Sequence, residues 1–395
     1  MADTKILEAK INQTLVLKKI RHQSGISRIE IARELGLNRS TITHIVSDLL
    51  NKKLLIEGEA LRGTLSQGGR TPIGLALNKK NGLVLGVEWQ TNYFRYVLTD
   101  VMGGIISEGT RSLKRKDTRA FYLGLKDIIN KSQTAYKTPV KALSVGIPGR
   151  VNPFEGKVLR SLAFGFDDFS LAAEMSNEFS LPVLIENDAN CFAWGELQKS
   201  DRNTGNLLCL MLEFHFRGGG ENKDKDENKD EGEGVFDDQE IGIGIVQNEK
   251  VYYGAQYSAG ELDRELVQTA LKKEHLDHIR KTGKVSQEDE SMVKEYVHKL
   301  FYALKPIVSV LDPGTVILGG DFLLLRDYID RALHTIYGED QNFLGKSEIV
   351  WKYSIMGEYE VAFGSACHLL ESMFTIPSYE MGNHERIINW EQVLN

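Results

Sequence analysis

A short apolar run that ends in a cluster of amide and carboxylate side chains constrains this chain more than any other stretch. Val183, Leu184 and Ile185 are aliphatic and predict a short, buried strand. Polar side chains follow at once in residues 186–190, and a helical pattern begins at Ala189. Open α/β sheets bind ligands at this kind of place, where a buried parallel strand gives way to a helix.

Asp188 permits two interpretations that the stretch alone leaves open. At the end of the strand its carboxylate could accept a proton from a bound hydroxyl group. Alternatively, Asn187 and Asp188 cap the helix that follows, because both residue types accept hydrogen bonds from free backbone N–H groups.

The composition favours a protein of two or three domains. The chain has 395 residues, of which 42% are hydrophobic. No apolar run approaches the roughly 18 residues of a spanning helix, and the first five residues lack the apolar segment of a signal peptide. The three cysteines, Cys191, Cys209 and Cys367, are too widely spaced for a disulfide framework or a Cys-rich metal site. We expect a cytoplasmic protein without a membrane partner.

The net charge of −7 is unevenly distributed. Residues 1–72 carry 12 Lys and Arg against 7 Asp and Glu, which gives +5 and leaves −12 for the remaining residues. A basic N-terminal module on an acidic body indicates a polyanionic partner at one end of the molecule.

Three helices are predicted near the N-terminus. Apolar residues recur at helical spacing in residues 6–21. Ser27, with Glu30 three residues later, forms a capping-box pattern that begins a second helix, and this helix ends at Gly36. Asn38 is expected to cap the third helix.

Two short helices joined by a glycine-containing turn are typical of a helix-turn-helix motif, whose second helix enters the major groove. A three-helix bundle with a solvated face is the structural alternative. Two short apolar runs in residues 54–65 favour the first interpretation, because they predict the β-hairpin wing of a winged helix. The predicted DNA contacts are Arg39, Ser40, Thr41, Thr43, His44 and, in the wing, Arg62.

The body is expected to contain two α/β lobes of similar plan. In the first, strands at 82–87, 93–98 and 105–106 precede a helix at 121–130 and a strand at 142–147. In the second, strands are predicted at 206–212, 241–246, 251–253 and 316–320, with a helix at 291–304. Between them, residues 215–240 hold 10 acidic and 4 basic side chains and predict a disordered surface insertion. A calcium loop is a weaker alternative, because the required glycine is missing and the closing glutamate is misplaced.

In their order and spacing these motifs resemble the repressor/open-reading-frame/kinase (ROK) family, specifically its transcriptional regulators. The resemblance covers nearly the whole chain. Besides the predicted winged helix-turn-helix, it is carried by residues 68–72, 148–152, 186–190, 259–261, 311–320 and 364–366. It implies an actin-like, sugar-kinase-type fold of two ribonuclease-H-like lobes with a sugar site in the cleft. It also places Asp188 at the general-base position of the family's kinases, and Asn187 and Glu261 at sugar-contact positions.

Departures from the family pattern argue against catalysis. The family's kinases carry a glycine-rich phosphate loop where this chain has Glu88, Trp89, Gln90 and Thr91, and bulky side chains there hinder a backbone cradle for phosphate. Ala163 replaces a usual asparagine. The family's Gly-His pair is replaced by Asp263 and Arg264, and its zinc-binding cysteines are missing.

These departures also bear on cofactors. No cysteine lies between Cys209 and Cys367, and His275 with His278 cannot complete a tetrahedral zinc site. The prediction is therefore no metal, no cofactor and a vestigial base at Asp188. The predicted ligand contacts are Asn152, Asn187, Asp188, Glu261 and Arg264.

The sequence therefore predicts a non-enzymatic regulator of carbohydrate-metabolism genes, most simply a repressor. Its expected partners are double-stranded DNA, a sugar or sugar phosphate, and a second copy of the chain in a homodimer or higher homo-oligomer. The alternatives are an ATP-dependent sugar kinase that also binds DNA, and a regulator with a vestigial pocket that answers to a partner protein. The predicted divisions are a DNA-binding domain at 1–66, a linker at 67–80, lobes at 81–187 and 188–375, and at 376–395 a tail or helix packed on the first lobe.

Overall fold

The computed structural model describes residues 2–59, 73–114, 117–200, 205–215, 238–262, 273–287, 289–338, 349–375 and 388–394. Arg62, Arg264, residues 67–72 and residues 216–237 of the predicted insertion lie outside these ranges. The chain forms two compact units. Unit 1 comprises Met1–Cys191 and Val361–Asn395, and unit 2 comprises Phe192–Glu360.

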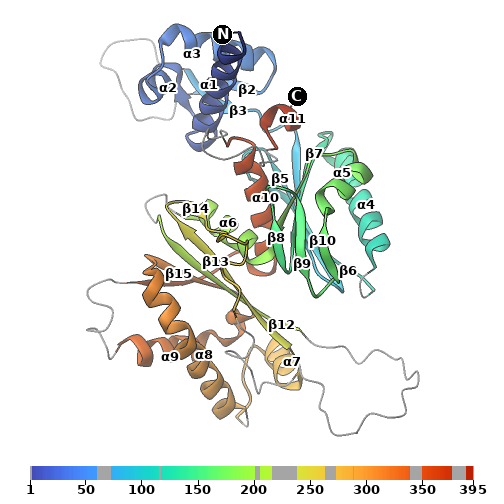
Figure 1. Cartoon of the computed structure of the whole chain (residues 1–395), viewed down its shortest axis with the longest axis vertical. Coiled ribbons are helices and arrows are strands. Elements are labelled where there is room, and N and C mark those ends of the chain that lie inside the picture. Colours follow the sequence, from blue (N-terminus) through green and yellow to red (C-terminus); the bar gives the residue numbers. More distant parts are fainter. Residues whose placement is uncertain are drawn as a thin grey trace. The chain divides into compact units, whose positions relative to one another are not determined.

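Unit 1 begins with a head of three helices and a small antiparallel sheet (Figure 1). The helices are α1 (Ala2–His22), α2 (Arg28–Leu35) and α3 (Arg39–Asn51), and the strands, in the order β1-β3-β2, are β1 (Ile26–Ser27), β3 (Ile73–Leu77) and β2 (Leu55–Glu59).

The local signals predicted for these helices are largely confirmed. The capping box at Ser27 and Glu30 is formed, and Gly36 ends α2 with φ of 65°. Asn38 occupies the cap position of α3, but its side chain makes no capping hydrogen bond.

The partner of the predicted wing strand differs from the expectation. The hairpin was expected inside residues 54–65, whereas β2 pairs with β3 across residues 55–77. Residues 73–77 therefore belong to the head and not to a linker at 67–80. The physical reason is burial, because Leu75 and Leu77 fill the core of the head.

The main sheet of unit 1 has the strand order β11-β7-β4-β5-β6. Its strands are β4 (Leu83–Trp89), β5 (Tyr93–Asp100), β6 (Ile105–Ser112), β7 (Val140–Ile147) and β11 (Val183–Asn187). The first three in sheet order run parallel, β5 runs antiparallel to β4, and β6 runs antiparallel to β5. A second small sheet contains β8 (Arg150–Asn152), β9 (Lys157–Ser161) and β10 (Phe166–Phe169).

Both faces of this sheet are covered by helices. On β4, the side chains of Leu83, Leu85 and Val87 belong to the same buried cluster as those of α4 (Thr118–Tyr136) and α5 (Leu171–Phe179). On the opposite face, Val84 belongs to the cluster of α10 (Glu360–Ser372) and α11 (Trp390–Leu394). The alternation follows from the two-residue period of a strand, and Figure 1 shows the helices on the two sides.

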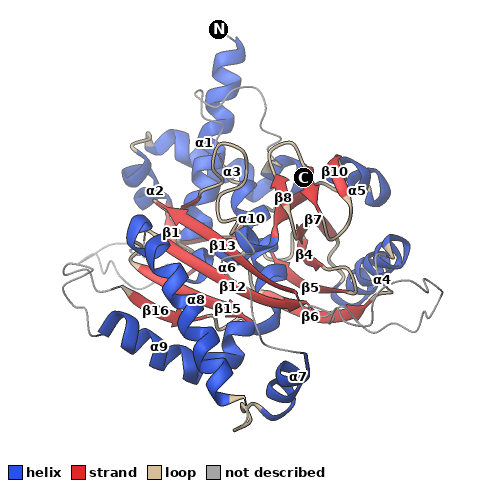
Figure 2. Ribbon diagram, turned by 60° about the horizontal axis from the view of Figure 1, so that its bottom comes forward, coloured by secondary structure: helices blue, strands red, loops and turns tan. Residues whose placement is uncertain are grey.

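Unit 2 repeats this strand plan in the order β14-β13-β12-β15-β16, with β12, β15 and β16 parallel. The strands are β12 (Leu207–His215), β13 (Asp238–Gln247), β14 (Lys250–Val251), β15 (Thr315–Gly320) and β16 (Val350–Tyr353). The helical elements are α7 (Lys273–Thr282), α8 (Glu290–Leu311), η2 (Asp321–Leu325), α9 (Arg326–Gly338) and η3 (Gly357–Tyr359). Helices α8 and α9 pack on one face of this sheet (Figure 2). The predicted similarity of the two lobes is confirmed.

Two predicted divisions of the body need correction. The first unit continues to Cys191, and α6 (Asp188–Lys199) starts in unit 1 and ends in unit 2. Helix α10 was expected in the second lobe at 188–375, but it belongs to unit 1, where it packs on β4. The ends of the predicted insertion at 215–240 are also ordered strand, because His215 pairs with Asp238 in the β12–β13 ladder.

Candidate ligand site and candidate nucleic-acid interface

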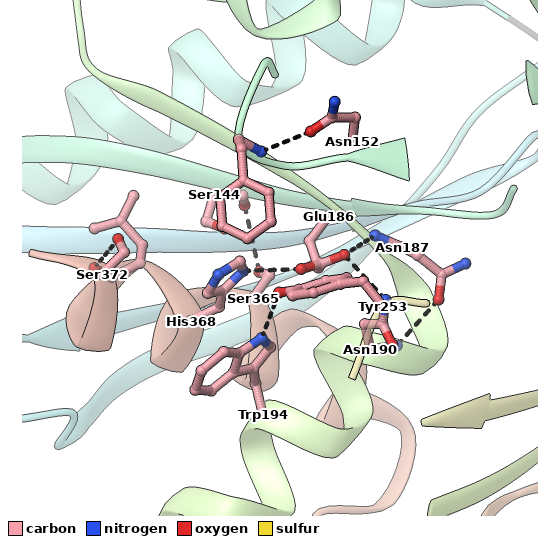
Figure 3. Close-up of polar contacts among 12 residues, drawn as sticks. Ser144, Asn152, Glu186, Asn187, Asn190, Trp194, Tyr253, Ser365, His368 and Ser372 are labelled. Carbon is pink, nitrogen blue, oxygen red and sulfur yellow. Dashed lines mark hydrogen bonds and ion pairs between the residues drawn. The ribbon is translucent and has the colours of Figure 1, made fainter. Parts of the chain in front are cut away.

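The loop at residues 186–190 is held by its own side chains. Strand β11 ends at Asn187 and α6 begins at Asp188, as the polarity pattern predicts. The side chain of Asn187 donates through Nδ2 to the carbonyl of Gly149, 2.9 Å away, and to Oδ1 of Asp188, 3.0 Å away. Its Oδ1 accepts from the backbone N–H of Asn190 at 3.0 Å. Figure 3 shows the contact between Asn187 and Asn190.

The capping interpretation of this loop therefore holds for Asn187, which satisfies a free N–H group in the first turn of α6. Asp188 is buried, and its Oδ1 accepts from the N–H of Ala189 at 2.9 Å. One carboxylate oxygen is thus committed to the loop. Capping and ligand contact do not exclude each other, because each oxygen of a carboxylate can accept two hydrogen bonds.

Glu186 lies behind this loop and is fully buried. Its Oε1 accepts from the N–H of Asn187 at 2.8 Å and from Nδ2 of Asn190 at 3.3 Å. Its Oε2 lies 3.2 Å from Nδ1 of His368 on α10. Burial lowers the pKa of His368 to about 3, so the imidazole is neutral near pH 7.

Asn152 is the last residue of β8 and is also buried, but its Oδ1 is engaged locally. It accepts from the backbone N–H groups of Phe154 and Glu155, at 3.1 and 3.2 Å. This is the geometry of an Asx turn, so the oxygen shapes the β8–β9 connection. The predicted ligand role of Asn152 stays a prediction.

Glu261 is exposed in unit 2, and a β-bridge joins it to Gly242. The preceding Gly260 has φ of 88°, and a Cβ there would lie 1.9 Å from the carbonyl oxygen of Ile243. Position 260 therefore requires glycine, and the local backbone conformation there sets the position of the adjacent Glu261.

Glu88 and Trp89, the last two residues of β4, have buried side chains. Trp89 is 1% exposed and stacks on Phe121 with ring centroids 4.0 Å apart. Glu88 is buried and paired with Arg95 at 3.1 Å, and it accepts from the hydroxyl of Tyr93 at 3.1 Å. Burial raises the pKa of Glu88, and the Arg95 charge opposes that effect.

Within the part of the chain that the structure describes, no three His, Cys, Asp or Glu side chains are grouped in a way that could hold a metal ion. His275 lies 3.4 Å from Asp289, and the three cysteine side chains are buried. Burial raises the pKa of the Cys191 and Cys209 thiols.

The start of α3 presents a polar surface on the head. Arg39, Ser40, Thr43 and His44 are exposed and Thr41 is half-buried. On the opposite side of the helix, Ile42, Ile45, Val46 and Leu49 are buried in the head. The predicted set of DNA contacts thus shares one accessible surface, except Arg62, which lies outside the described residues.

Sequence reasoning missed two residues of α10, one that contacts the loop at residues 186–190 and one that contacts α1 of the head. His368 and Glu371 lie on α10, about 180 residues beyond the loop at 186–190, and no local pattern connects them to it. Their only sequence signal is the presence of ionisable side chains in an otherwise small and apolar helix.

The structure thus defines a two-lobed α/β protein, with an N-terminal head of three helices packed on the first lobe. The family model described as ROK family matches residues 84–220. This segment of the chain is therefore similar to the ROK family. None of its described helices is long and apolar enough to cross a membrane.

Comparisons with individual proteins extend this result. The chain is 28% identical over 257 residues to the xylose repressor of Bacillus subtilis strain 168, a match that covers 64% of this chain and 59% of that protein. A solved ROK family transcriptional regulator, described as a homologue of the Escherichia coli Mlc protein, has a TM-score of 0.67 at 18% identity and covers 91% of this chain and 96% of its own. A ROK family glucokinase from Streptomyces griseus, solved with glucose and AMPPNP, has a TM-score of 0.54 at 17% identity and covers 72% of this chain. The fold is therefore the two-lobed, sugar-kinase-like ROK fold.

Proposed function

We propose that this protein is a sugar-responsive transcriptional repressor that has no catalytic activity. The observation that carries the proposal is the combination of a polar, accessible α3 surface on the head with a two-lobed ROK body in which β4 ends in the buried side chains of Glu88 and Trp89. The similarity to a named xylose repressor and to a ROK transcriptional regulator supports the same conclusion.

The head is proposed to act as a winged helix-turn-helix, with β2 and β3 as the wing. Helix α3 then enters the major groove with Arg39, Ser40, Thr41, Thr43 and His44 toward the bases and phosphates. Arg39 is the residue suited to bidentate pairing with guanine. Arg62 is proposed as a further phosphate contact from the wing. A homodimer would place two such helices about one helical turn, or several whole turns, apart on the DNA.

The effector is proposed to be a sugar or sugar phosphate, held by Asp188 and Asn187 with Asn152, Glu261 and Arg264. D-xylose is the first candidate because of the similarity to the B. subtilis xylose repressor. Carbohydrate-metabolism genes are the corresponding regulatory targets.

Selection of bound DNA from a random duplex pool tests this function directly. The purified chain should enrich one sequence class, and D-xylose or another sugar of a defined panel should release it. Absence of any enriched sequence would contradict the proposal.

A sugar kinase that also binds DNA is the second candidate function, and the retained Asp188 is the observation that favours it. Assays of ATP consumption with the same sugar panel distinguish the two, because the repressor proposal predicts no sugar-dependent turnover. Phosphoryl transfer depends on positioning and charge stabilisation of the phosphate, and residues 88–91 contain no glycine that would favour a backbone cradle for it.

A further inference from the structure

Two cationic side chains and one imidazole of α1 meet one carboxylate of α10. Glu371 Oε2 lies 2.7 Å from Nη1 of Arg21 and 3.3 Å from Nε2 of His22, and Glu371 Oε1 lies 3.0 Å from Nζ of Lys18. The three residues lie three and four positions apart, on one face of the helix. The Arg21 side chain is only 2% exposed, so its charge depends on this partner. The hydrogen bond from His22 and the charges of Arg21 and Lys18 hold the pKa of Glu371 well below its usual range, despite burial.

Apolar packing surrounds this ion-pair cluster. Val16, Leu17 and Ile20 of α1 share one buried cluster with residues of α10 and α11 and with the flanking Met373, Phe374 and Ile388. The Arg21 guanidinium lies 5.8 Å from the ring centroid of Phe374. From α11, Trp390 donates through Nε1 to Oγ1 of Thr14 at 3.0 Å. The head is therefore docked on the C-terminal helices through α1.

The same helix α10 contacts the loop at residues 186–190. His368 lies one helical turn before Glu371, and its Nδ1 faces Oε2 of Glu186 at 3.2 Å. The charge of Glu371 raises the pKa of His368 against the larger effect of burial, so the two side chains interact electrostatically. Glu186 in turn holds Asn187 and Asn190 through its Oε1.

We propose that α10 transmits the state of the loop at residues 186–190 to the head, with His368 contacting the loop through Glu186 and Glu371 holding α1. The inference rests on the proposed function, in which this loop binds the effector and the head binds DNA. A sugar that rearranges the hydrogen bonds of Asn187 or Asp188 changes the environment of Glu186, and therefore the preferred position of His368. Because α10 packs closely on β4, a displaced His368 moves the helix as a unit and alters the Glu371 cluster. The size of the effect is limited by the difference in affinity of the sugar for the two arrangements.

Hydrogen exchange of the unmodified chain provides the first test, with and without saturating D-xylose. Protection should change together in the loop at residues 183–190, in α10 and in α1, and should stay constant in α4, on the other face of the sheet. A change in the loop with constant protection in α1 and α10 would overturn the proposal. This measurement requires neither DNA nor a variant that folds.

The second test compares the Glu371→Gln variant with the matched control Glu391→Gln. Glu391 pairs with Lys10 of the same helix α1 at 3.0 Å, but from α11 and on a more exposed surface. The readout is the factor by which saturating D-xylose changes the Kd for the selected DNA. A coupling of about tenfold is expected in the unmodified chain and in the control, within the usual allosteric range of about 5- to 150-fold. In Glu371→Gln it should fall below about threefold.

The outcomes distinguish failure of the proposed role of α10 from failure of the proposed function. Full coupling in Glu371→Gln would overturn the role of α10 while leaving the proposed function intact. An unmodified chain that binds no DNA, or whose DNA binding no sugar changes, would overturn the proposed function and this inference with it.

Discussion

Oδ1 of Asn187 accepts a hydrogen bond from the backbone nitrogen of Asn190 at 3.0 Å, so the amide expected to contact a ligand also caps α6. Its Nδ2 donates to the carbonyl of Gly149 and thereby ties β11 to the turn after β7. The loop is thus shaped before any ligand arrives, which lowers the entropic cost of binding.

Asn187→Ala should lower the free energy of unfolding by about 1–2 kcal/mol, because it removes an N-cap and leaves the Asn190 N–H without its acceptor. Urea denaturation followed by far-UV circular dichroism measures the change. Asn187→Ser is the matched variant and should recover most of the loss, since serine also caps helices. Equal stability of the alanine variant and the unmodified chain would contradict the capping role.

Asp188→Asn should weaken the response of DNA binding to its sugar and leave DNA binding itself unchanged. Asparagine keeps an oxygen for the N–H of Ala189 but loses the negative charge that attracts a sugar hydroxyl. The measurement is DNA affinity by fluorescence anisotropy across a sugar titration, with an expected loss of roughly 1.5–3 kcal/mol in sugar binding. ATP turnover that depends on a sugar and disappears in this variant would instead identify an enzyme.

Arg39→Ala should relax or abolish the choice of DNA sequence, at a cost of about 1–3 kcal/mol in specific binding. The side chain is exposed at the first position of α3, so the folded head should be unaffected. Affinities for the selected sequence and for a scrambled duplex are compared at one salt concentration. Arg33→Ala, an exposed change near the end of α2, serves as the control. An unchanged footprint in Arg39→Ala would exclude this placement of the recognition helix.

Gly86→Ala should destabilise unit 1 because α10 passes very close to β4. A Cβ at Gly86 would lie 2.1 Å from the carbonyl oxygen of Ala362 and 2.8 Å from the side chain of Ala366. Overpacking of this kind costs about 1–3 kcal/mol, measurable as a lower urea midpoint. Gly58→Ala is the control, since its added Cβ meets nothing within 4 Å. Similar midpoints in the two variants would mean that α10 is not docked as described.

Acidification should destabilise the fold through His368. Burial lowers its pKa from 6.5 to about 3, so the folded state favours the neutral imidazole while the unfolded state binds the proton. The stability that depends on a neutral His368 is therefore fully present above about pH 6.5 and is lost progressively as the pH falls toward 3. Between pH 7 and pH 5 the free energy of unfolding should fall by about 2 kcal/mol.

The His368→Asn variant tests this assignment, because a side chain that does not titrate should reduce the loss of stability between pH 7 and 5. Urea midpoints at the two pH values provide the measurement. Glu371 contributes little in this window, since its lowered pKa means that its stabilisation is lost only below the usual carboxylate range. An identical pH dependence in the variant would contradict the neutral, buried state of His368.

The sequence by itself determined the local elements and their repetition. Ser27 and Glu30 signalled the start of α2 because a capping box involves only neighbouring residues. The aliphatic run before Glu186 predicted β11, and the change in polarity at Asn187 located the start of α6. The two-lobed plan and the polar surface of α3 were also predictable, since both follow from hydrophobic periodicity along short stretches.

Only the tertiary structure decided which distant segments meet. Residues 73–77 complete the small sheet of the head because Leu75 and Leu77 need its core, and α10 returns to unit 1 because Gly86 leaves room for its backbone. The pairing of Arg21 with Glu371 joins positions 350 residues apart. Hydrophobic patterns specify that a face must be buried, but not against which partner, so these long-range pairings depend on packing that no local stretch of sequence encodes.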